Sequence, residues 1–167
     1  MSSNNTIIQI PIKPHLKKYL YFKLGTKKNI IQISTSDPIN FGFAVLSLTL
    51  RKNEYLYYCD KKKFTNFINS LDRNCFITIS IGPYYIQSAG LFFTDQKIFY
   101  LNKFIEKQFR NELYSNVNWS YVKDPKTVKE YDLEDLINFF NINEDEIKKE
   151  SIVRDFHRNT QKYQYFH

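Results

Sequence analysis

Six lysines and no acidic residue occupy the first 36 positions of this chain, and lysine is a side chain suited to binding phosphate. They are Lys13, Lys17, Lys18, Lys23, Lys27 and Lys28. The chain has 24 Lys and Arg against 17 Asp and Glu, so without these six the balance is 18 against 17. A block of one charge indicates a partner of the opposite charge, and clustered lysines on a phosphate backbone release counterions. We therefore expect a nucleic-acid partner; the alternative is a solvated helix face that keeps the protein in solution.

Three aromatic residues, Tyr19, Tyr21 and Phe22, stand among these lysines. Rings between cations are typical of proteins that bind single strands, because exposed bases stack on them. The alternative is that two of the three rings belong to the hydrophobic core.

A second cationic pattern lies near the end of the chain. Drawn as a helix, this segment has Ile152, Phe156 and Tyr163 on one face, with Val153 at its edge. The opposite side carries Arg154, Arg158, Gln161 and Lys162. A short helix, a three-residue turn and such a second helix make up a helix-turn-helix, whose second helix enters the major groove, where Arg and Gln read base edges. The alternative is an ordinary amphipathic hairpin with a solvated charged face.

The sequence favours neither a catalytic site nor a metal site. His15, His157 and His167 are isolated from one another and from cysteine, so no pair has the spacing of metal ligands. There is no glycine-rich phosphate loop and no nucleophile elbow. We therefore predict a protein that is not an enzyme and that uses no cofactor.

Composition is typical of a folded chain in a reducing compartment. Hydrophobic residues make up 43% of the 167 residues, no apolar run is long enough to cross a bilayer, and residues 1–6 have no signal-peptide pattern. The two cysteines, Cys59 and Cys75, make no disulfide framework, and we interpret them as reduced packing residues. We expect a cytoplasmic protein with no membrane partner.

Local signals predict a strand, a helix and a second strand in the first 33 residues. The first strand, 7–10, ends at Pro11, and Pro14 then opens a helix that Gly25 closes as a left-handed cap. The second strand covers 30–33, and the two strands could pair in one sheet.

The middle of the chain is predicted to hold one helix and several strands. Asp37 as a cap and Pro38 in the first turn indicate a helix, although the following residues up to Leu50 nearly alternate as in a strand; we predict a helix. Strands are predicted over residues 55–59, 76–81 and 84–87, the last entered through Gly82-Pro83.

The longest predicted helix covers 95–116 and is capped by Thr94. The composition changes at Lys123, which divides the chain into a core domain, 1–122, and a C-terminal pair of helices, 123–167. A turn at 141–143 joins these two helices. We therefore predict an α+β fold in which a small sheet packs on the long helix, with a C-terminal helical hairpin like a helix-turn-helix.

Three stretches of the chain carry a resemblance. They are Ile10-Pro11-Ile12-Lys13-Pro14-His15-Leu16-Lys17-Lys18-Tyr19, then Leu101-Asn102-Lys103-Phe104-Ile105-Glu106, and the ending 139–146 with Arg154-Asp155-Phe156-His157-Arg158. Together they resemble a family of small proteins encoded by phages and mobile elements of Bacteroidetes. Since members of such families are described as hypothetical or DNA-binding proteins, the resemblance implies a genetic context, and no residue role is transferred from it.

We therefore expect a non-enzymatic nucleic-acid-binding protein of a phage or mobile element, acting in the host cytoplasm, with DNA favoured over RNA. The alternative is a virion structural or cargo protein, or a protein that binds a phage or host protein. The 15 Phe and 13 Tyr support this alternative, because aromatic residues are enriched in interfaces between proteins. A homo-oligomer is compatible with either function.

Overall fold

The computed structural model describes the backbone of residues 5–26, 29–51, 54, 62–123 and 129–163. In chain order the elements are β1 (Thr6–Pro11), α1 (Pro14–Lys23), β2 (Ile30–Gln32), α2 (Phe41–Leu48), α4 (Lys62–Asn69), β3 (Phe76–Ile81), α5 (Pro83–Ala89), α6 (Asp95–Lys123), α7 (Lys129–Phe139) and α8 (Lys149–Tyr163). They form two compact units, Met1–Lys107 and Gln108–His167, so α6 begins in the first and ends in the second. The predicted domain boundary at residue 123 lies at the end of α6. None of the helices in these ranges is long and apolar enough to cross a membrane.

The first unit is built around a three-stranded mixed sheet in the order β1-β3-β2. β1 runs antiparallel to β3 and β2 runs parallel to it, and Ile8 and Ile31 both pair with Ile79. The predicted strands 7–10 and 30–33 thus share one sheet, with β3 between them. The side chains alternate along each strand, so Ile77, Ile79 and Ile81 lie on one face and are fully buried there.

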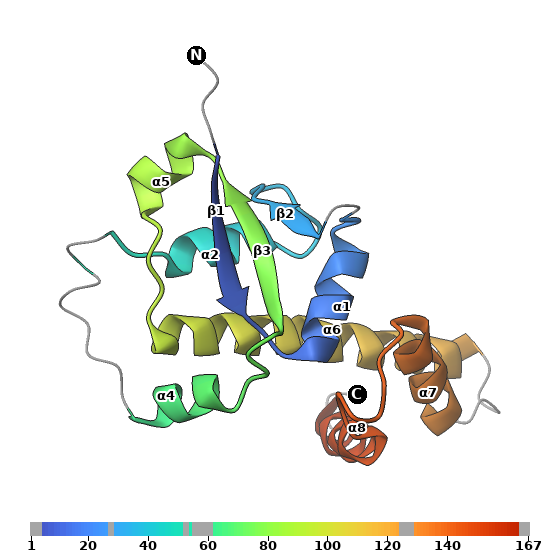
Figure 1. Ribbon diagram of the computed structural model, residues 1–167. Coiled ribbons are helices and arrows are strands. Elements are labelled where there is room, and N and C mark those ends of the chain that lie inside the picture. Colours follow the sequence, from blue (N-terminus) through green and yellow to red (C-terminus); the bar gives the residue numbers. More distant parts are fainter. Residues whose placement is uncertain (1–4, 27–28, 52–53, 55–61, 124–128, 164–167) are drawn as a thin grey trace. The chain divides into compact units, whose positions relative to one another are not determined.

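The buried face of this sheet is covered by helices of the first unit, whereas no described helix of that unit crosses the opposite face. Figure 1 shows α2 and α6 behind the sheet and the front of β1 and β3 uncovered. On α6, Leu101 and Ile105 are buried, and the side-chain amide of Asn102 donates a hydrogen bond to the carbonyl oxygen of Pro11 at 3.1 Å. The predicted α+β class, with a small sheet on a long helix and a C-terminal helical hairpin, is confirmed.

α1 begins and ends where the sequence predicts. Pro14 occupies the first turn, and Gly25 takes a left-handed conformation with φ of 59°. The N–H of Gly25 donates to the carbonyl of Phe22 at 3.3 Å and that of Thr26 to Tyr21 at 3.2 Å, which is a Schellman motif. Gly25 therefore satisfies carbonyls that would otherwise lack partners at the end of the helix.

The predicted helix after Asp37 is confirmed as α2, although Pro38 precedes the helix and is not in its first turn. Both carboxylate oxygens of Asp37 accept backbone hydrogen bonds, from Phe41 at 2.7 Å and from Gly42 at 2.7 Å. The carboxylate thus caps α2 from four residues upstream of Phe41, because Asn40 turns the chain through a left-handed conformation.

The predicted strand 84–87 is wrong, because these residues lie in α5. Pro83 stands at the first helical position with its φ preset, and Gly90 closes the helix with φ of 91°. β3 is paired on both sides, so no place beside it remains for another strand. The predicted strand 55–59 lies outside the described residues.

Two further helices, α4 and α6, differ from the sequence prediction. α4 was not predicted; its Phe64 and Phe67 pack against Phe99, with ring centroids 5.3 and 5.0 Å apart. α6 continues past the predicted residue 116 to Lys123, and the buried Val117 extends its apolar face.

The second unit contains the predicted hairpin of α7 and α8. Asn141, with φ of 53°, ends α7 in a second Schellman motif: its N–H donates to Asn138 at 2.8 Å and that of Ile142 to Ile137 at 3.1 Å. Because Ile137 and Ile142 are both buried, the end of α7 is held by apolar packing as well as hydrogen bonds.

The connection between α7 and α8 is longer than the predicted three-residue turn. The carboxylate of Glu146 accepts the N–H of Asn143 at 2.8 Å, which is one of the two hydrogen bonds of a capping box. One turn forms there, but α8 begins only at Lys149, where the carbonyl of Lys148 accepts the N–H groups of Ser151 and Ile152. The connection therefore runs over residues 140–148, and its geometry differs from that of the tight turn in a helix-turn-helix.

Gly42 allows α2 to lie against the backbone after β2, which gives a prediction for stability. A methyl group at this position would lie 1.9 Å from the carbonyl oxygen of Ser34. We expect Gly42→Ala to lower the free energy of unfolding by about 3 kcal/mol. Gly82→Ala is the matched control, because its methyl group would meet its nearest neighbour at 3.8 Å. Urea unfolding followed by circular dichroism should separate the two variants; equal losses would contradict this packing.

Candidate nucleic-acid interface

α1 presents part of the lysine block beside the uncovered face of the sheet. Leu16, Tyr19 and Leu20 are buried, which leaves Lys17 and Tyr21, one turn apart, at the border of that face. The Nζ of Lys17 lies 5.7 Å from the ring centroid of Tyr21 and 5.7 Å from that of Phe76 on β3. A cation at this distance from a ring is attracted by the negative face of the ring, so Lys17 is held in place by two aromatic neighbours.

The three rings among the lysines have three different environments. Tyr19 is a core residue, Tyr21 is half-buried, and Phe22 is 52% exposed. The hydroxyl of Tyr21 donates a hydrogen bond to the carbonyl of Asn29 at 3.1 Å, and burial raises the pKa of Tyr21. Tyr21 is therefore a fixed, neutral ring, whereas Phe22 offers an accessible one; only Tyr19 is fully in the core.

The first lysine of the block has a structural role that the sequence did not predict. Lys13 Nζ lies 3.3 Å from Oε2 of Glu106, and Nε2 of the buried His15 lies 3.2 Å from the same oxygen. The backbone N–H of Lys13 also donates to the side-chain oxygen of Asn102 at 3.2 Å. These contacts hold the start of α1 against α6, so much of the charge of Lys13 is offset by Glu106.

Two other lysines of the block, Lys18 and Lys23, lie on α1. Lys18 and Lys23 are half-exposed on α1, and Lys23 lines a hollow of about 530 Å³ between the end of α1 and β2. Ile30, Gln32 and Ser34 also line this hollow. Lys27 and Lys28 lie outside the described residues.

The second predicted cationic surface is on α8, in the second unit. Ile152 and Phe156 are buried, as predicted, and Arg154 and Arg158 are exposed. The side chains of Gln161 and Lys162 lie outside the described residues. Glu150 is exposed one turn before Arg154, so an acidic side chain interrupts the cationic face.

A hollow of about 440 Å³ lies between α7 and α8, and Arg154 is one of its lining residues. Its floor is apolar, from Leu133, Ile137 and Val153, and Glu150 and Lys149 lie with Arg154 among its charged residues. Lys149 also forms an ion pair with Glu134 across the two helices. Arg158 is exposed and is not among the residues that line this hollow.

A hydrogen-bonded cluster fixes α8 against the second part of α6. Arg110 donates to Asp155 at 2.8 Å and to the hydroxyl oxygen of Tyr114 at 3.2 Å, while the hydroxyl of Tyr114 donates to the same carboxylate oxygen at 2.8 Å. Burial, reinforced by the bond to Asp155, raises the pKa of Tyr114 to about 12. The cluster positions the residues that flank Arg154, and the sequence pattern alone did not indicate it.

No group of three or more His, Cys, Asp or Glu residues described by the structure could hold a metal ion. Cys75 is buried just before β3, in agreement with the packing role predicted for it. Cys59 lies outside the described residues.

Comparisons with protein-family models, with curated proteins and with solved structures find no match to this chain. The two basic surfaces described above are therefore interpreted from their own geometry.

The Tyr114 cluster predicts a loss of stability at high pH. In the unfolded chain the tyrosine pKa is 10.0, so between about pH 10 and pH 12 the folded protein keeps a proton that the unfolded chain has lost. The contribution of Tyr114 is thus complete below this window and falls as the pH rises through it. We expect the free energy of unfolding of Tyr114→Phe to fall less than that of the wild type between about pH 9 and pH 11. Tyr84→Phe, at an exposed tyrosine, controls for the loss of one phenol; equal behaviour of the two variants would contradict the assignment.

Proposed function

We propose that this chain is a non-enzymatic nucleic-acid-binding protein of a phage or mobile element, with DNA favoured over RNA. The observation that carries the proposal is the position of Lys17, held between the rings of Tyr21 and Phe76 at the border of an uncovered sheet face. The acid-free start of the chain surrounds this position with further lysines. The resemblance of three stretches to small phage and mobile-element proteins supports the genetic context and a place in the host cytoplasm.

The two basic surfaces are suited to different contacts. Lysine is a flexible point charge that neutralises phosphate without reading sequence, which fits Lys17 and Lys18. Arginine can make two parallel hydrogen bonds to a guanine, which fits the exposed Arg158 on α8. In this proposal α1 supplies affinity and α8 supplies sequence preference.

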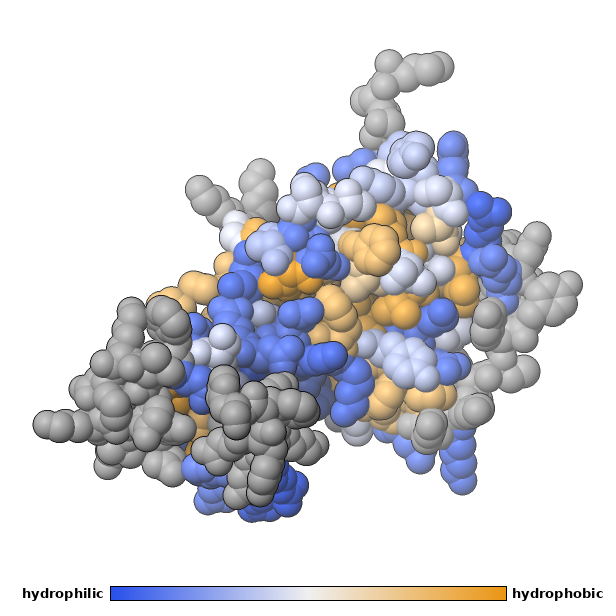
Figure 2. All heavy atoms as spheres, turned by 180° about the vertical axis from the view of Figure 1, so that it is seen from behind, coloured by the Kyte–Doolittle hydropathy of each residue, from blue (hydrophilic) through white to orange (hydrophobic). Residues whose placement is uncertain are grey.

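A second candidate is a virion component or a protein that binds another protein. It is favoured by exposed aromatic side chains in the first unit: Phe43 on α2 is 64% exposed and Tyr84 on α5 is 75% exposed. Figure 2 shows hydrophobic side chains gathered on the face opposite to that of Figure 1, where α2 lies. A large oligomer purified without nucleic acid would favour this candidate, whereas a monomer or dimer that copurifies with nucleic acid would favour the first.

Salt dependence tests the phosphate contacts of α1. If Lys17 and Lys18 each neutralise one phosphate of a duplex, replacing both by Ala should lower the log–log salt slope by about 1.8, and it should weaken all sequences equally. Lys103→Ala combined with Lys107→Ala is the matched control, because both lysines are exposed on α6 and Lys103 likewise lies over a ring, that of Phe99. Fluorescence anisotropy at several salt concentrations measures both slopes. Equal slopes in the two double variants would mean that net charge alone governs binding.

Sequence preference tests the role of α8. Arg158→Ala should weaken binding to a selected duplex site by about 1–3 kcal/mol more than binding to random duplex, if Arg158 makes a bidentate base contact. The Lys17 and Lys18 double variant is the control, since it should lose affinity on both duplexes alike. Equal loss on both duplexes for Arg158→Ala would mean that α8 contacts phosphates only, and it would rule out a role of α8 in sequence preference.

A further inference from the structure

We propose that a single strand of nucleic acid lies across the uncovered face of the sheet, with bases stacked beside Tyr21 and on Phe22. This inference rests on the proposed function and deepens it, since it names a form of nucleic acid that the first unit takes in addition to a duplex. The surface consists of Lys17 and Tyr21 of α1 with Ile7, Gln9, Thr78, Ile30 and Gln32 of the three strands, and it continues round α1 to Phe22. We call it the sheet-front surface.

The first support is the open sheet face itself. The pairing places Gln9, Thr78 and Ile30 side by side on the face opposite the buried isoleucines. Gln9 and Gln32 are exposed, and so are the large apolar side chains of Ile7 and Ile30. Exposed apolar side chains gathered on one face often mark an interaction site, and several single-strand-binding folds receive bases on a sheet face.

The second support is the arrangement of rings at the border of this face. Tyr21 and Phe76 both lie 5.7 Å from the Nζ of Lys17, so two rings and one cation form a single compact group. Phe22, the next residue after Tyr21, is half-exposed and accessible to a stacked base. Bases in a duplex are stacked on one another and cannot reach such rings, whereas the bases of a single strand can.

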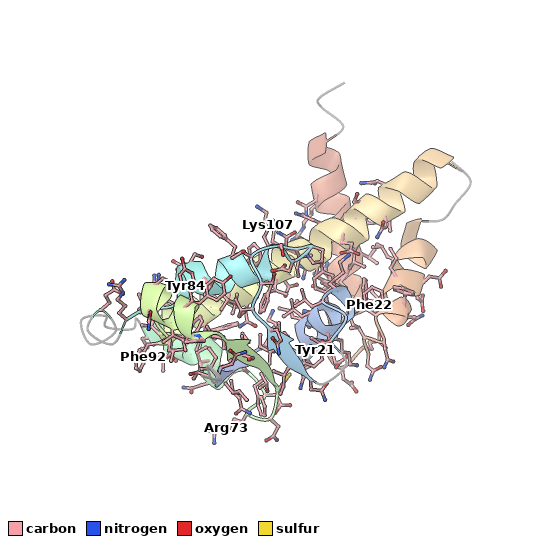
Figure 3. The ribbon with its side chains drawn as sticks, turned by 90° about the horizontal axis from the view of Figure 1, so that it is seen from above. Tyr21, Phe22, Arg73, Tyr84, Phe92 and Lys107 are labelled. Atoms are coloured by element: carbon pink, nitrogen blue, oxygen red, sulfur yellow. The ribbon has the colours of Figure 1, made fainter. Side chains whose placement is uncertain are left out.

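The third support is charge. Figure 3, seen from above, places Arg73 on the front side of the sheet, and Tyr21 and Phe22 on the part of the unit formed by α1. Arg73 is exposed in the turn before β3 beside the exposed Asp72, so the cations of this surface lie mainly on α1. The carboxylate of Asp37, near β2, accepts backbone N–H groups at the start of α2, where the positive end of the helix dipole offsets part of its charge.

The fourth support is the hollow beside β2. Its volume of about 530 Å³ is within the usual range of small-ligand sites, and Gln32 and Ser34 supply an amide and a hydroxyl among its lining residues. Lys23 lies at the same hollow. A base from a strand on the sheet-front surface can enter here, with its phosphate near Lys23 and its edge toward the polar groups.

The test compares two exposed phenylalanines of the first unit. Phe22→Ala should weaken binding of a labelled oligothymidylate or oligouridylate of about 16 nucleotides by about 5-fold to 150-fold, the loss of one stacked base. Phe43→Ala is the matched control, because Phe43 is also exposed but lies on α2, behind the sheet, and it should change affinity by less than about 2-fold. Phe22→Tyr keeps a ring and should retain wild-type affinity. Duplex binding by Phe22→Ala should equal that of the wild type.

Each outcome separates this inference from the proposed function. Wild-type binding to duplex without binding to either oligonucleotide would overturn the sheet-front surface while leaving the proposed function intact. Equal losses for Phe22→Ala and Phe43→Ala, or a loss for Phe22→Tyr as large as that for Phe22→Ala, would also overturn it. Binding to no nucleic acid at low salt would overturn both. Tighter binding of oligothymidylate or of oligouridylate decides whether the strand is DNA or RNA.

Discussion

The first unit depends on the burial of one face of β3. Ile77, Ile79 and Ile81 are fully buried, and β1 and β2 both pair with the strand that carries them. An isolated hairpin is marginal in water, so the apolar layer from α6 and α2 behind these isoleucines is what makes a three-stranded sheet stable. Because a register shift by one residue would turn all three isoleucines to the front, this burial also fixes which side chains the front face presents.

A buried carboxylate connects this core to the lysine block. Glu106 accepts contacts from both Lys13 and His15, and Asn102, one turn earlier on α6, bonds the backbone on either side of Ile12. Breaking such a pair by removing one partner leaves a buried charge without compensation, which is costly. The start of α1 is therefore held firmly, and the direction in which Lys17 and Tyr21 leave the helix follows from it.

The elements that could be predicted from the sequence are those with signals inside a few residues. Pro14 and Gly25 predicted α1, Asp37 predicted α2, and the alternation of 76–81 predicted β3, because turn conformations and side-chain periods are local properties. The strand predicted over residues 84–87 is wrong. Their composition is typical of a strand, but Pro83 starts a helix there and β3 has no unpaired side for another strand. Part of the candidate site was predicted as well, in the lysines of α1 and the buried and exposed sides of α8. Two ion pairs offset cationic charges: Glu106 pairs with Lys13, and Asp155 pairs with Arg110. The partners in each pair are distant in sequence, so no local pattern predicts them.

The division of the chain inside α6 has a consequence for how this gene can change. Compact units that are joined by a loop can be exchanged between genes at that loop, whereas here the two units share one uninterrupted helix. An exchange near Lys107 would join two half-helices, and each junction would have to keep both the helical hydrogen bonds and the phase of the apolar stripe. The two halves of this protein are therefore expected to be inherited together, as one unit of recombination.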